Sequence, residues 1–313
     1  YFSEENLMKI LITGGSGTIG KAFIKEFPEH TYYNISRNEK FLTDLLREHP
    51  KTKSYIGNIE DEGFLMRVFN SVKPDVVIHA AAMKHINIAE ENPIQTCQSN
   101  VIGSINVINA SIMNDVPITI GISTDKACSS ESVYGDTKSL MEKCFMEANT
   151  TKNRFALTRF ANVAHSNGSV LPFWLESKRK DKPIKITDPD MNRLIFSKSD
   201  AAKLIKHAID KCKNGDGGFV CSYKMKSVNM MEMAKTIAYE GFISEIQEIG
   251  KRPGEKVNED LISEEELPFT YVHGDMIYIY NQENLDENTL SEPYSSATAD
   301  KMTEEEIKNL VWT

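Results

Sequence analysis

The sequence of 313 residues lacks any long apolar run. No stretch approaches the ~20 consecutive apolar residues that a membrane-spanning helix needs. The first residues, 1–8, contain Glu4 and Glu5 and no apolar core, so they do not have the pattern of a secretory signal peptide. From these absences we expect a cytoplasmic protein that has no membrane partner.

Positive charge is also in short supply, with 36 Lys and Arg against 45 Asp and Glu and a formal net charge of −9. This balance argues against nucleic acid as a partner, because general nucleic-acid binding needs an excess of Lys and Arg. None of the five cysteines forms a CxxC pair, and no His lies at zinc-finger spacing from them. We therefore expect reduced thiols and no metal site.

The first half of the chain alternates short apolar runs with longer amphipathic stretches. Continuous Val and Ile runs are typical of strands buried on both faces, and strands that alternate with helices favour a doubly wound parallel sheet of the α/β class. The predicted strands are 10–12, 32–35, 54–56, 76–78 and 118–122, and the predicted helices are 18–27, 64–71, 94–114 and 134–148.

The second half carries more turn signals, such as Asn167-Gly168 and Asp188-Pro189. A helix at 199–211 and an apolar run at 218–222 should return to the large sheet, and a last helix is expected at 303–311. We predict a nucleotide-binding Rossmann domain at 1–165 plus about 194–222. The remainder, about 166–193 and 223–313, should form a smaller interleaved α/β domain that binds the substrate.

A glycine motif follows the first predicted strand and precedes the first predicted helix. Gly14, Gly17 and Gly20 form a GxxGxxG pattern, which allows a tight turn, a close approach of a pyrophosphate and close packing of helix on strand. The helix N-terminus then offers free N–H groups to the phosphates. This context predicts a dinucleotide site, which should also include Ser16, Thr18 and Ile19.

The end of the second strand reads Ser36-Arg37-Asn38 and has no acidic side chain at the first two positions. A site specific for NAD usually has an acid there to hold the ribose 2′-hydroxyl, whereas Arg suits a 2′-phosphate. We therefore predict NADP, with a solvated surface Arg37 as the alternative. Asn58 after the third strand should contact the adenine, with Ile59 beside it.

The fifth strand ends at Thr124, and Tyr134 and Lys138 follow with the spacing that puts two residues on one helix face. A cationic Lys138 would stabilise the Tyr134 phenolate and make it a usable base, while Thr124 would orient a substrate hydroxyl. Asp125 and Lys126 leave two interpretations open. They are either a surface ion pair or a second acid–base pair of the kind that an elimination requires.

Seven stretches in this order resemble the inverting UDP-N-acetylglucosamine 4,6-dehydratases, which are extended short-chain dehydrogenase/reductases. The similarity runs from about Lys9 to the end of the chain, and the Ser-Thr-Asp-Lys-Ala and Arg-Pro-Gly-Glu-Lys motifs are specific to this group. The chain keeps Tyr134, where the longer membrane-anchored relatives have Met. The stretches are TGGSGTIG, HAAAMKHINIAEENP, SNVIGSINVINA, STDKACSSESVYGDTK, RFANVAHSNGSVLPFW, ITDPDMNRLIF and GKRPGEKVNEDLISEEE.

The resemblance implies a redox-neutral removal of water from UDP-N-acetylglucosamine or a close UDP-hexose. Tyr134 would take the proton of the 4-hydroxyl, Lys126 would remove H5, and Asp125 would protonate the departing 6-hydroxyl. Lys126 must be neutral for this role, so we expect the site to lower its pKa. Protonation on the opposite face of C5 would give the L-arabino 4-keto-6-deoxy product. The family also implies a homo-oligomer, often a hexamer.

The family motifs assign further positions, each of which has a purely structural role as its alternative. Cofactor contacts are expected at Ala80, Ala81, Ala82 and Asn100, besides Tyr134 and Lys138. Sugar contacts are expected at Lys84, His85, Asn162, Ser169 and Val170, diphosphate or uridine contacts at Arg193 and Arg252, and a ribose contact at Glu255. Departures from the family pattern leave the hexose open, and they are Asn58, Phe160-Ala161, His165, Asn167 and Leu194-Ile195.

Two other functions compete with a dehydratase. A nucleotide-sugar 4-epimerase or reductase on the same fold would use Tyr134 and Lys138 but would not need Asp125 and Lys126. A catalytically silent NADP-binding regulatory or scaffold protein would need none of the four residues.

Overall fold

The computed structural model describes residues 7–251, 255–284 and 288–312. Within them a nine-stranded sheet forms in the order β14-β15-β10-β6-β5-β4-β1-β2-β3. All neighbours from β3 to β10 are parallel, whereas β15 and β14 add an antiparallel edge. The strands are β1 (Lys9–Thr13), β2 (Thr31–Ser36), β3 (Lys53–Ile56), β4 (Val76–His79), β5 (Ile118–Thr124), β6 (Arg154–Phe160), β10 (Phe219–Tyr223), β14 (Thr270–His273) and β15 (Met276–Tyr280).

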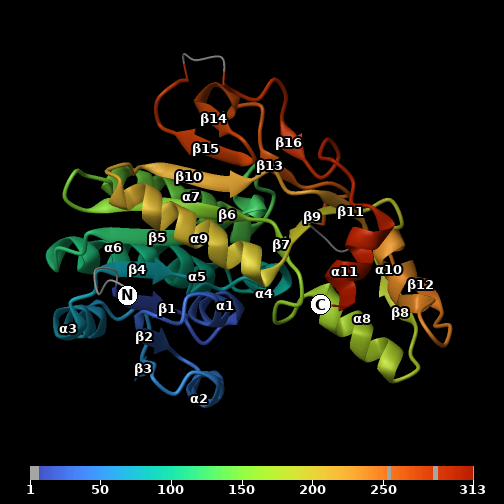
Figure 1. Ribbon diagram of the computed structural model, residues 1–313, viewed down its shortest axis with the longest axis horizontal. Helices are drawn as coiled ribbons and strands as arrows, with labels where there is room; N and C mark the ends of the chain where they lie inside the picture. Colours follow the sequence, from blue (N-terminus) through green and yellow to red (C-terminus); the bar gives the residue numbers. More distant parts are fainter. Residues whose placement is uncertain (1–6, 252–254, 285–287, 313) are drawn as a thin grey trace, which may run out of the picture.

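Helices cover both faces of this sheet because its central strands are apolar on both sides. In β1, Ile10 and Ile12 join a core with α1 (Thr18–Glu26) and α9 (Lys198–Lys213). Leu11, between them, joins a second core with α3 (Glu62–Val72) and α6 (Gly103–Met113), and α7 (Val133–Ala148) packs beside α6. Figure 1 shows α9 crossing one face of the sheet. The strand and helix alternation therefore produces the predicted doubly wound fold.

A smaller lobe lies beside the carboxyl ends of the parallel strands (Figure 1). It contains a three-stranded sheet in the order β11-β9-β7 and two two-stranded ladders, β12-β8 and β13-β16. Its helices pack around Trp174, Met233, Ile237 and Ile307, which form a core of their own. The elements are β7 (Asn162–Val163), α8 (Val170–Arg179), β8 (Ile184–Ile186), β9 (Asn192–Phe196), β11 (Ser227–Asn229), α10 (Met230–Ala238), β12 (Ile246–Glu248), β13 (Asp260–Ile262), β16 (Tyr294–Ser295) and α11 (Glu304–Trp312).

The predicted domain boundaries need two corrections. Residues 270–280 form β14 and β15 of the large sheet, although 223–313 was assigned to the smaller domain, because β15 pairs with β10 along its length. Residues 194–196 belong to β9 of the small sheet, although the large domain was expected to resume at about 194. The chain therefore crosses between the two lobes more often than its turn signals indicated.

The long helix predicted at 94–114 is interrupted. It comprises α5 (Pro93–Cys97), a π-helical turn at Gln98–Ile102 and α6. A π turn inserts an extra residue into the helical ladder and re-aims the side chains there. Asn100 on this turn accepts a hydrogen bond from the N–H of Met83 and donates to the Met83 carbonyl and to Thr137.

Five elements of the large lobe were not predicted, namely β6, β14, β15, α2 (Glu39–Glu48) and α4 (Ile86–Glu91). Two short 3-10 helices, Asp125–Ala127 and Leu267–Phe269, complete the secondary structure of the described residues. None of the helices in these residues is long and apolar enough to cross a membrane.

Candidate active site

A cavity of about 570 Å³ opens at the carboxyl ends of β1, β2, β4 and β5. It brings together the glycine turn, the ends of these strands, the start of α7 and the segment 160–169 of the smaller lobe. In open α/β sheets ligands bind at this edge, where the strand order reverses. The cavity is therefore the candidate active site.

The glycine turn is built to let another group approach the backbone. Gly14 has φ +72°, and a Cβ there would lie 2.8 Å from the Ala81 nitrogen. A Cβ on Gly20 would lie 2.4 Å from the Gly15 carbonyl oxygen, so only glycine lets α1 pack this close to β1. Gly17 caps α1 without a side-chain hydrogen bond, which leaves the N–H groups of the first turn for an anionic ligand.

The predicted cofactor positions at the turn and at the ends of β2 and β3 line the cavity as one surface. Ser16 Oγ and Ser36 Oγ are 2.7 Å apart, and Arg37 next to them is exposed. The positions that line the cavity are Gly14, Ser16, Gly17, Thr18, Ile19, Ser36, Arg37, Asn58, Ile59, Ala80, Ala81 and Ala82. Gly20 and Asn100 are not part of this surface. Gly20 allows α1 to pack against Gly15, and Asn100 holds the loop at Met83 by a hydrogen bond.

Tyr134 and Lys138 lie near the start of α7, where Ser132 caps the helix by accepting a hydrogen bond from the N–H of Gly135 at 3.1 Å. Burial lowers the pKa of Lys138 to about 8, although Glu142 opposes this, and its Nζ donates to the Ile122 carbonyl at 2.5 Å. Lys138 is thus held at the end of β5.

The predicted lowering of the Tyr134 pKa by Lys138 is wrong, and Lys138 is not among the groups that shift this pKa. Burial raises the pKa of Tyr134 to about 12, and the cation that opposes this is Lys126, helped by a hydrogen bond with Thr124. Burial dominates because Tyr134 is only 9% exposed. Deprotonation of Tyr134 therefore depends on charge that a ligand brings to the cavity.

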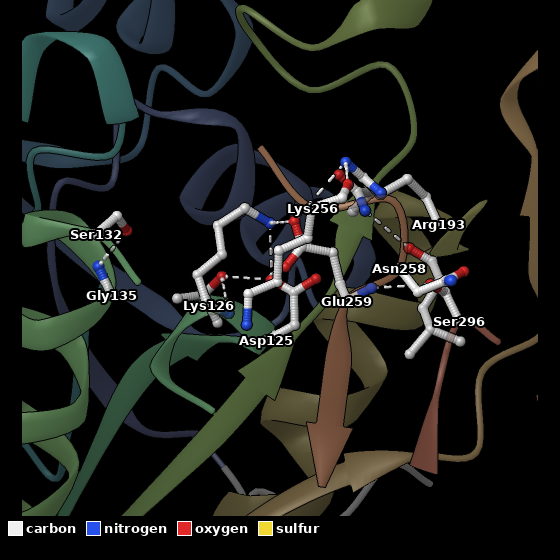
Figure 2. A network of polar contacts seen from close by, with 12 residues as sticks. Asp125, Lys126, Ser132, Gly135, Arg193, Lys256, Asn258, Glu259 and Ser296 are labelled. Atoms are coloured by element: carbon white, nitrogen blue, oxygen red, sulfur yellow. Dashed lines mark hydrogen bonds and ion pairs between the residues drawn. The ribbon is translucent and has the colours of Figure 1, made fainter. Parts of the chain in front are cut away.

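Asp125 and Lys126 form a direct pair rather than a surface dipeptide (Figure 2). Asp125 is 1% exposed, and its Oδ1 accepts hydrogen bonds from Thr124 Oγ1 at 2.9 Å and from Lys126 Nζ at 3.0 Å. Its Oδ2 has no hydrogen-bond partner among the described residues. Both residues line the cavity. Of the two interpretations that the sequence left open, the geometry thus favours a functional pair.

The pKa of Lys126 moves opposite to the expected direction. Burial acts to lower it, but the carboxylates of Asp125 and Glu259 outweigh burial and raise the pKa above its ordinary value. Lys126 Nζ is 3.6 Å from Glu259 Oε1. Glu259 was not predicted as a site residue, because its position three residues after the Arg-Pro-Gly-Glu-Lys motif does not reveal that it reaches Lys126.

The predicted sugar contacts divide into two groups. Lys84, His85, Asn162 and Ser169 line the cavity, and the buried Ser169 Oγ has no partner among the described residues. Lys84 donates to the Asn167 carbonyl at 2.7 Å. Val170 begins α8 behind the cavity wall.

The predicted diphosphate, uridine and ribose contacts lie elsewhere. Arg193 does not line the cavity, and its guanidinium donates to the carbonyls of Asn192, Lys256 and Val257. Because these bonds occupy its Nη donors, the geometry does not support a phosphate contact for Arg193. Glu255 is described but is not among the cavity-lining residues, and Arg252 lies outside the described residues.

The parallel sheet, the glycine turn at its centre and the Tyr134–Lys138 pair beyond β5 define an extended short-chain dehydrogenase/reductase. Within that class, the chain belongs to the family described as polysaccharide biosynthesis protein, whose model matches residues 10–281.

Relatives and solved structures confirm this family resemblance. A Campylobacter jejuni protein named UDP-N-acetylglucosamine 4,6-dehydratase (inverting) is 36% identical, over 85% of this chain and 80% of the relative. A Rickettsia canadensis protein named UDP-glucose 4-epimerase is 31% identical, over 97% and 95%. A Methanocaldococcus jannaschii protein named as an uncharacterized membrane protein is 37% identical, over 96% and 94%. The structure of Pen from Bacillus thuringiensis superposes with a TM-score of 0.89 at 28% identity, covering 99% of this chain and 98% of that one.

Proposed function

We propose that this protein is an NADP-dependent UDP-N-acetylglucosamine 4,6-dehydratase that inverts the configuration at C5. The observation that carries the proposal is the Asp125–Lys126 pair, in contact at 3.0 Å within the same cavity as Tyr134 and the glycine turn. An oxidoreductase that only oxidises and reduces C4 needs no second acid–base pair. The names of relatives at about 36% identity support the same reaction.

The cavity fits a nicotinamide dinucleotide. Gly17 at the N-cap of α1 has no side chain, so a pyrophosphate could approach the N–H groups of the first turn. Arg37 would hold a 2′-phosphate, and Lys138 at the end of β5 would hold the nicotinamide ribose. When bound, the dinucleotide supplies the hydride acceptor for C4 and the hydride donor for C6.

The protein's own side chains then move three protons. Tyr134 takes the proton of the 4-hydroxyl, with Thr124 orienting that hydroxyl. The 4-ketone acidifies H5, and the neutral amine of Lys126 removes it while the C5–H electron pair forms the C5–C6 double bond. The 6-hydroxyl leaves with the proton of Asp125 as water. A proton from water, added to the opposite face of C5, gives the inverted product, and Tyr134 returns its proton to water.

After such an elimination Asp125 and Lys126 would form an ion pair. Lys126 has then gained a proton and Asp125 has lost one, and Lys126 Nζ donates to Asp125 Oδ1 at 3.0 Å. Transfer of one proton along this hydrogen bond restores the neutral amine and the carboxylic acid. The raised pKa of Lys126 therefore describes the resting pair and makes Lys126 a stronger base once it is neutral.

The substrate would lie along the wall formed by Lys84, His85, Asn162 and Ser169, whose polar atoms surround the cavity on the side of the smaller lobe. Contacts of Arg252 and Glu255 with the nucleotide remain part of the proposal, as does a homo-oligomer. The departures at Phe160, Ala161 and Asn167 lie in this same wall, so a close UDP-hexose is the alternative substrate.

A UDP-sugar 4-epimerase is the second candidate, and relatives at 31% identity carry that name. It would use the same Tyr134, Lys138 and Thr124. The buried Asp125, which lines the cavity and has an Oδ2 without a partner among the described residues, speaks against it, because epimerisation at C4 breaks no C–O bond at C6.

The experiment is incubation of the protein with UDP-N-acetylglucosamine in deuterated water, followed by mass spectrometry and NMR. Loss of water with deuterium at an inverted C5 is the expected result. Formation of UDP-N-acetylgalactosamine without loss of water would replace the dehydratase by the 4-epimerase. Recovery of unchanged UDP-N-acetylglucosamine together with dehydration of another UDP-hexose would change the assigned substrate and leave the assigned reaction unchanged.

A further inference from the structure

Glu259 is a buried carboxylate that the mechanism above does not use. Glu259 is 8% exposed, and its side chain lies beside those of Lys126 and Asp125 (Figure 2). The closest charged atoms are Lys126 Nζ at 3.6 Å and Arg193 Nη2 at 3.8 Å. These distances are those of ion pairs rather than hydrogen bonds, so Glu259 acts on Lys126 through its charge.

We propose that Glu259 is a positioning residue that keeps Lys126 strongly basic and fixes its amine beside Asp125. The proposal rests on the proposed function for its consequence in catalysis, but its physical content, the effect of Glu259 on the Lys126 amine, can be measured without any substrate.

The main chain at Glu259 is anchored from both sides. Its N–H donates to Ser296 Oγ at 3.0 Å, and its carbonyl accepts from the N–H of Ser296 at 2.9 Å. Arg193 fixes the preceding segment through the carbonyls of Lys256 and Val257. This anchoring explains why Arg193 is buried away from the cavity: it holds the segment that delivers Glu259 and lies against the Glu259 carboxylate.

The charges around Lys126 are nearly balanced without a ligand. Asp125 and Glu259 oppose Lys126 and Arg193, while Lys256 lies farther out, paired with Glu131 at 3.1 Å, and Tyr134 is neutral. Burial raises the pKa of Glu259, and Lys126 acts against that rise. Removal of the Glu259 charge would leave Lys126 with one carboxylate and a nearby Arg193, which disfavours the ammonium form.

The consequence for catalysis follows from the proton balance. When Lys126 takes H5 its charge changes from 0 to +1, and the Glu259 carboxylate stabilises the ammonium that forms. The same carboxylate has no such effect on oxidation at C4, where Tyr134 takes the proton. A loss of Glu259 should therefore move the pH dependence of elimination to lower pH, where Lys126 then becomes neutral, and spare the first oxidation.

The test uses Glu259→Gln, which removes the charge and keeps the shape. Competitive labelling with acetic anhydride at pH 8, with the Lys126 peptide quantified by mass spectrometry, reports the fraction of neutral amine. The Lys126 side chain is 22% exposed and lines the cavity, so acetic anhydride can reach its amine. We expect labelling of Lys126 to rise about tenfold or more over wild-type, because loss of an opposite charge at this distance lowers a lysine pKa.

Two further variants serve as controls. Glu264→Gln makes the same chemical change at an exposed position of the same segment and should leave labelling at the wild-type level. Glu259→Asp keeps the charge on a shorter side chain and should label less than Glu259→Gln. Equal labelling of Lys126 in wild-type, Glu259→Gln and Glu264→Gln, all with native melting temperatures, would overturn the proposal.

The catalytic arm separates this inference from the proposed function. With UDP-N-acetylglucosamine, the pH dependence of deuterium incorporation at C5 should lie about one pH unit lower in Glu259→Gln than in wild-type, in line with the labelling result. Reduction of bound dinucleotide at 340 nm should proceed as in wild-type. A wild-type protein that fails to dehydrate the sugar contradicts the proposed function only, and the labelling result still decides the effect of Glu259. Equal losses in both half-reactions would assign Glu259 a merely structural role and overturn its role as a positioning residue for Lys126.

Discussion

Replacement of Arg159 by Met should destabilise this protein far more than an equivalent change at the surface. Arg159 is 2% exposed within β6, and its guanidinium binds the carboxylates of Glu142 and Glu266. Four N–H···O bonds of 2.6–3.0 Å join it to these two groups, and a fifth reaches the Leu261 carbonyl at 2.8 Å. Arg159 thus ties the large sheet to the segment that carries Glu259.

The magnitude follows from the burial of Arg159 and Glu142, with Glu266 partly buried. Removing one member of a buried ion pair leaves an uncompensated charge and costs about 3–5 kcal/mol. For a chain of this size we expect a fall in Tm of about 10 °C. Arg179→Met is the matched control, because Arg179 pairs with Glu176 on an exposed face of α8 with its side chain 78% exposed. Such surface pairs contribute about 0–1 kcal/mol.

The assay is thermal and urea unfolding of both variants and wild-type across pH. Burial acts to raise the pKa of Glu266, but Arg159 outweighs it and lowers the pKa below its ordinary value. This contribution to stability is present above the ordinary pKa of 4.5 and is lost as the pH falls through the folded value. The difference in the free energy of unfolding between wild-type and Arg159→Met should therefore become smaller at acid pH. If Arg159→Met loses no more stability than Arg179→Met at neutral pH, the reasoning is refuted.

Three further predictions concern the site. Gly20→Ala should lower the free energy of unfolding by about 1–3 kcal/mol or more, since its Cβ would lie 2.4 Å from Gly15. Gly63→Ala is the control, because its Cβ would have its nearest contact at 3.4 Å. In the same unfolding assay this variant should be as stable as wild-type or more stable. Arg37→Ser should weaken NADP binding about tenfold in a fluorescence titration and leave NAD unchanged, and a wild-type protein that prefers NAD would contradict the cofactor assignment. Burial lowers the pKa of Lys138 to about 8 from 10.5 despite Glu142, so its contribution should make folding more favourable as pH rises between these values. Lys138→Met should remove this rise in the free energy of unfolding with pH. An unchanged slope of stability against pH would contradict the prediction.

The sequence predicted those parts of the fold and site that depend on local pattern. The strands around the glycine turn are continuous apolar runs, and the turn, Tyr134 and Lys138 each lie at fixed spacing from a strand end. Because the carboxyl ends of parallel strands meet at one edge, residues far apart in the chain could be placed in one cavity.

The parts that were missed depend on contacts between distant segments. Strand β6 escaped prediction because Arg154 and Arg159 break its apolar pattern, and only Glu142 and Glu266 make a buried Arg159 possible. The predicted direction of the Lys126 pKa was also wrong, since the pKa is raised by Asp125 and, from the other lobe, by Glu259. A sequence pattern predicts burial but does not show which charge will compensate it.

The most direct test of the account is Lys126→Ala in deuterated water with UDP-N-acetylglucosamine. The account predicts that this variant incorporates no deuterium at C5 and loses no water, while bound dinucleotide is still reduced at 340 nm as C4 is oxidised. Deuterium exchange at C5 equal to that of wild-type would show that another group removes the proton and would contradict the assigned role of the Asp125–Lys126 pair.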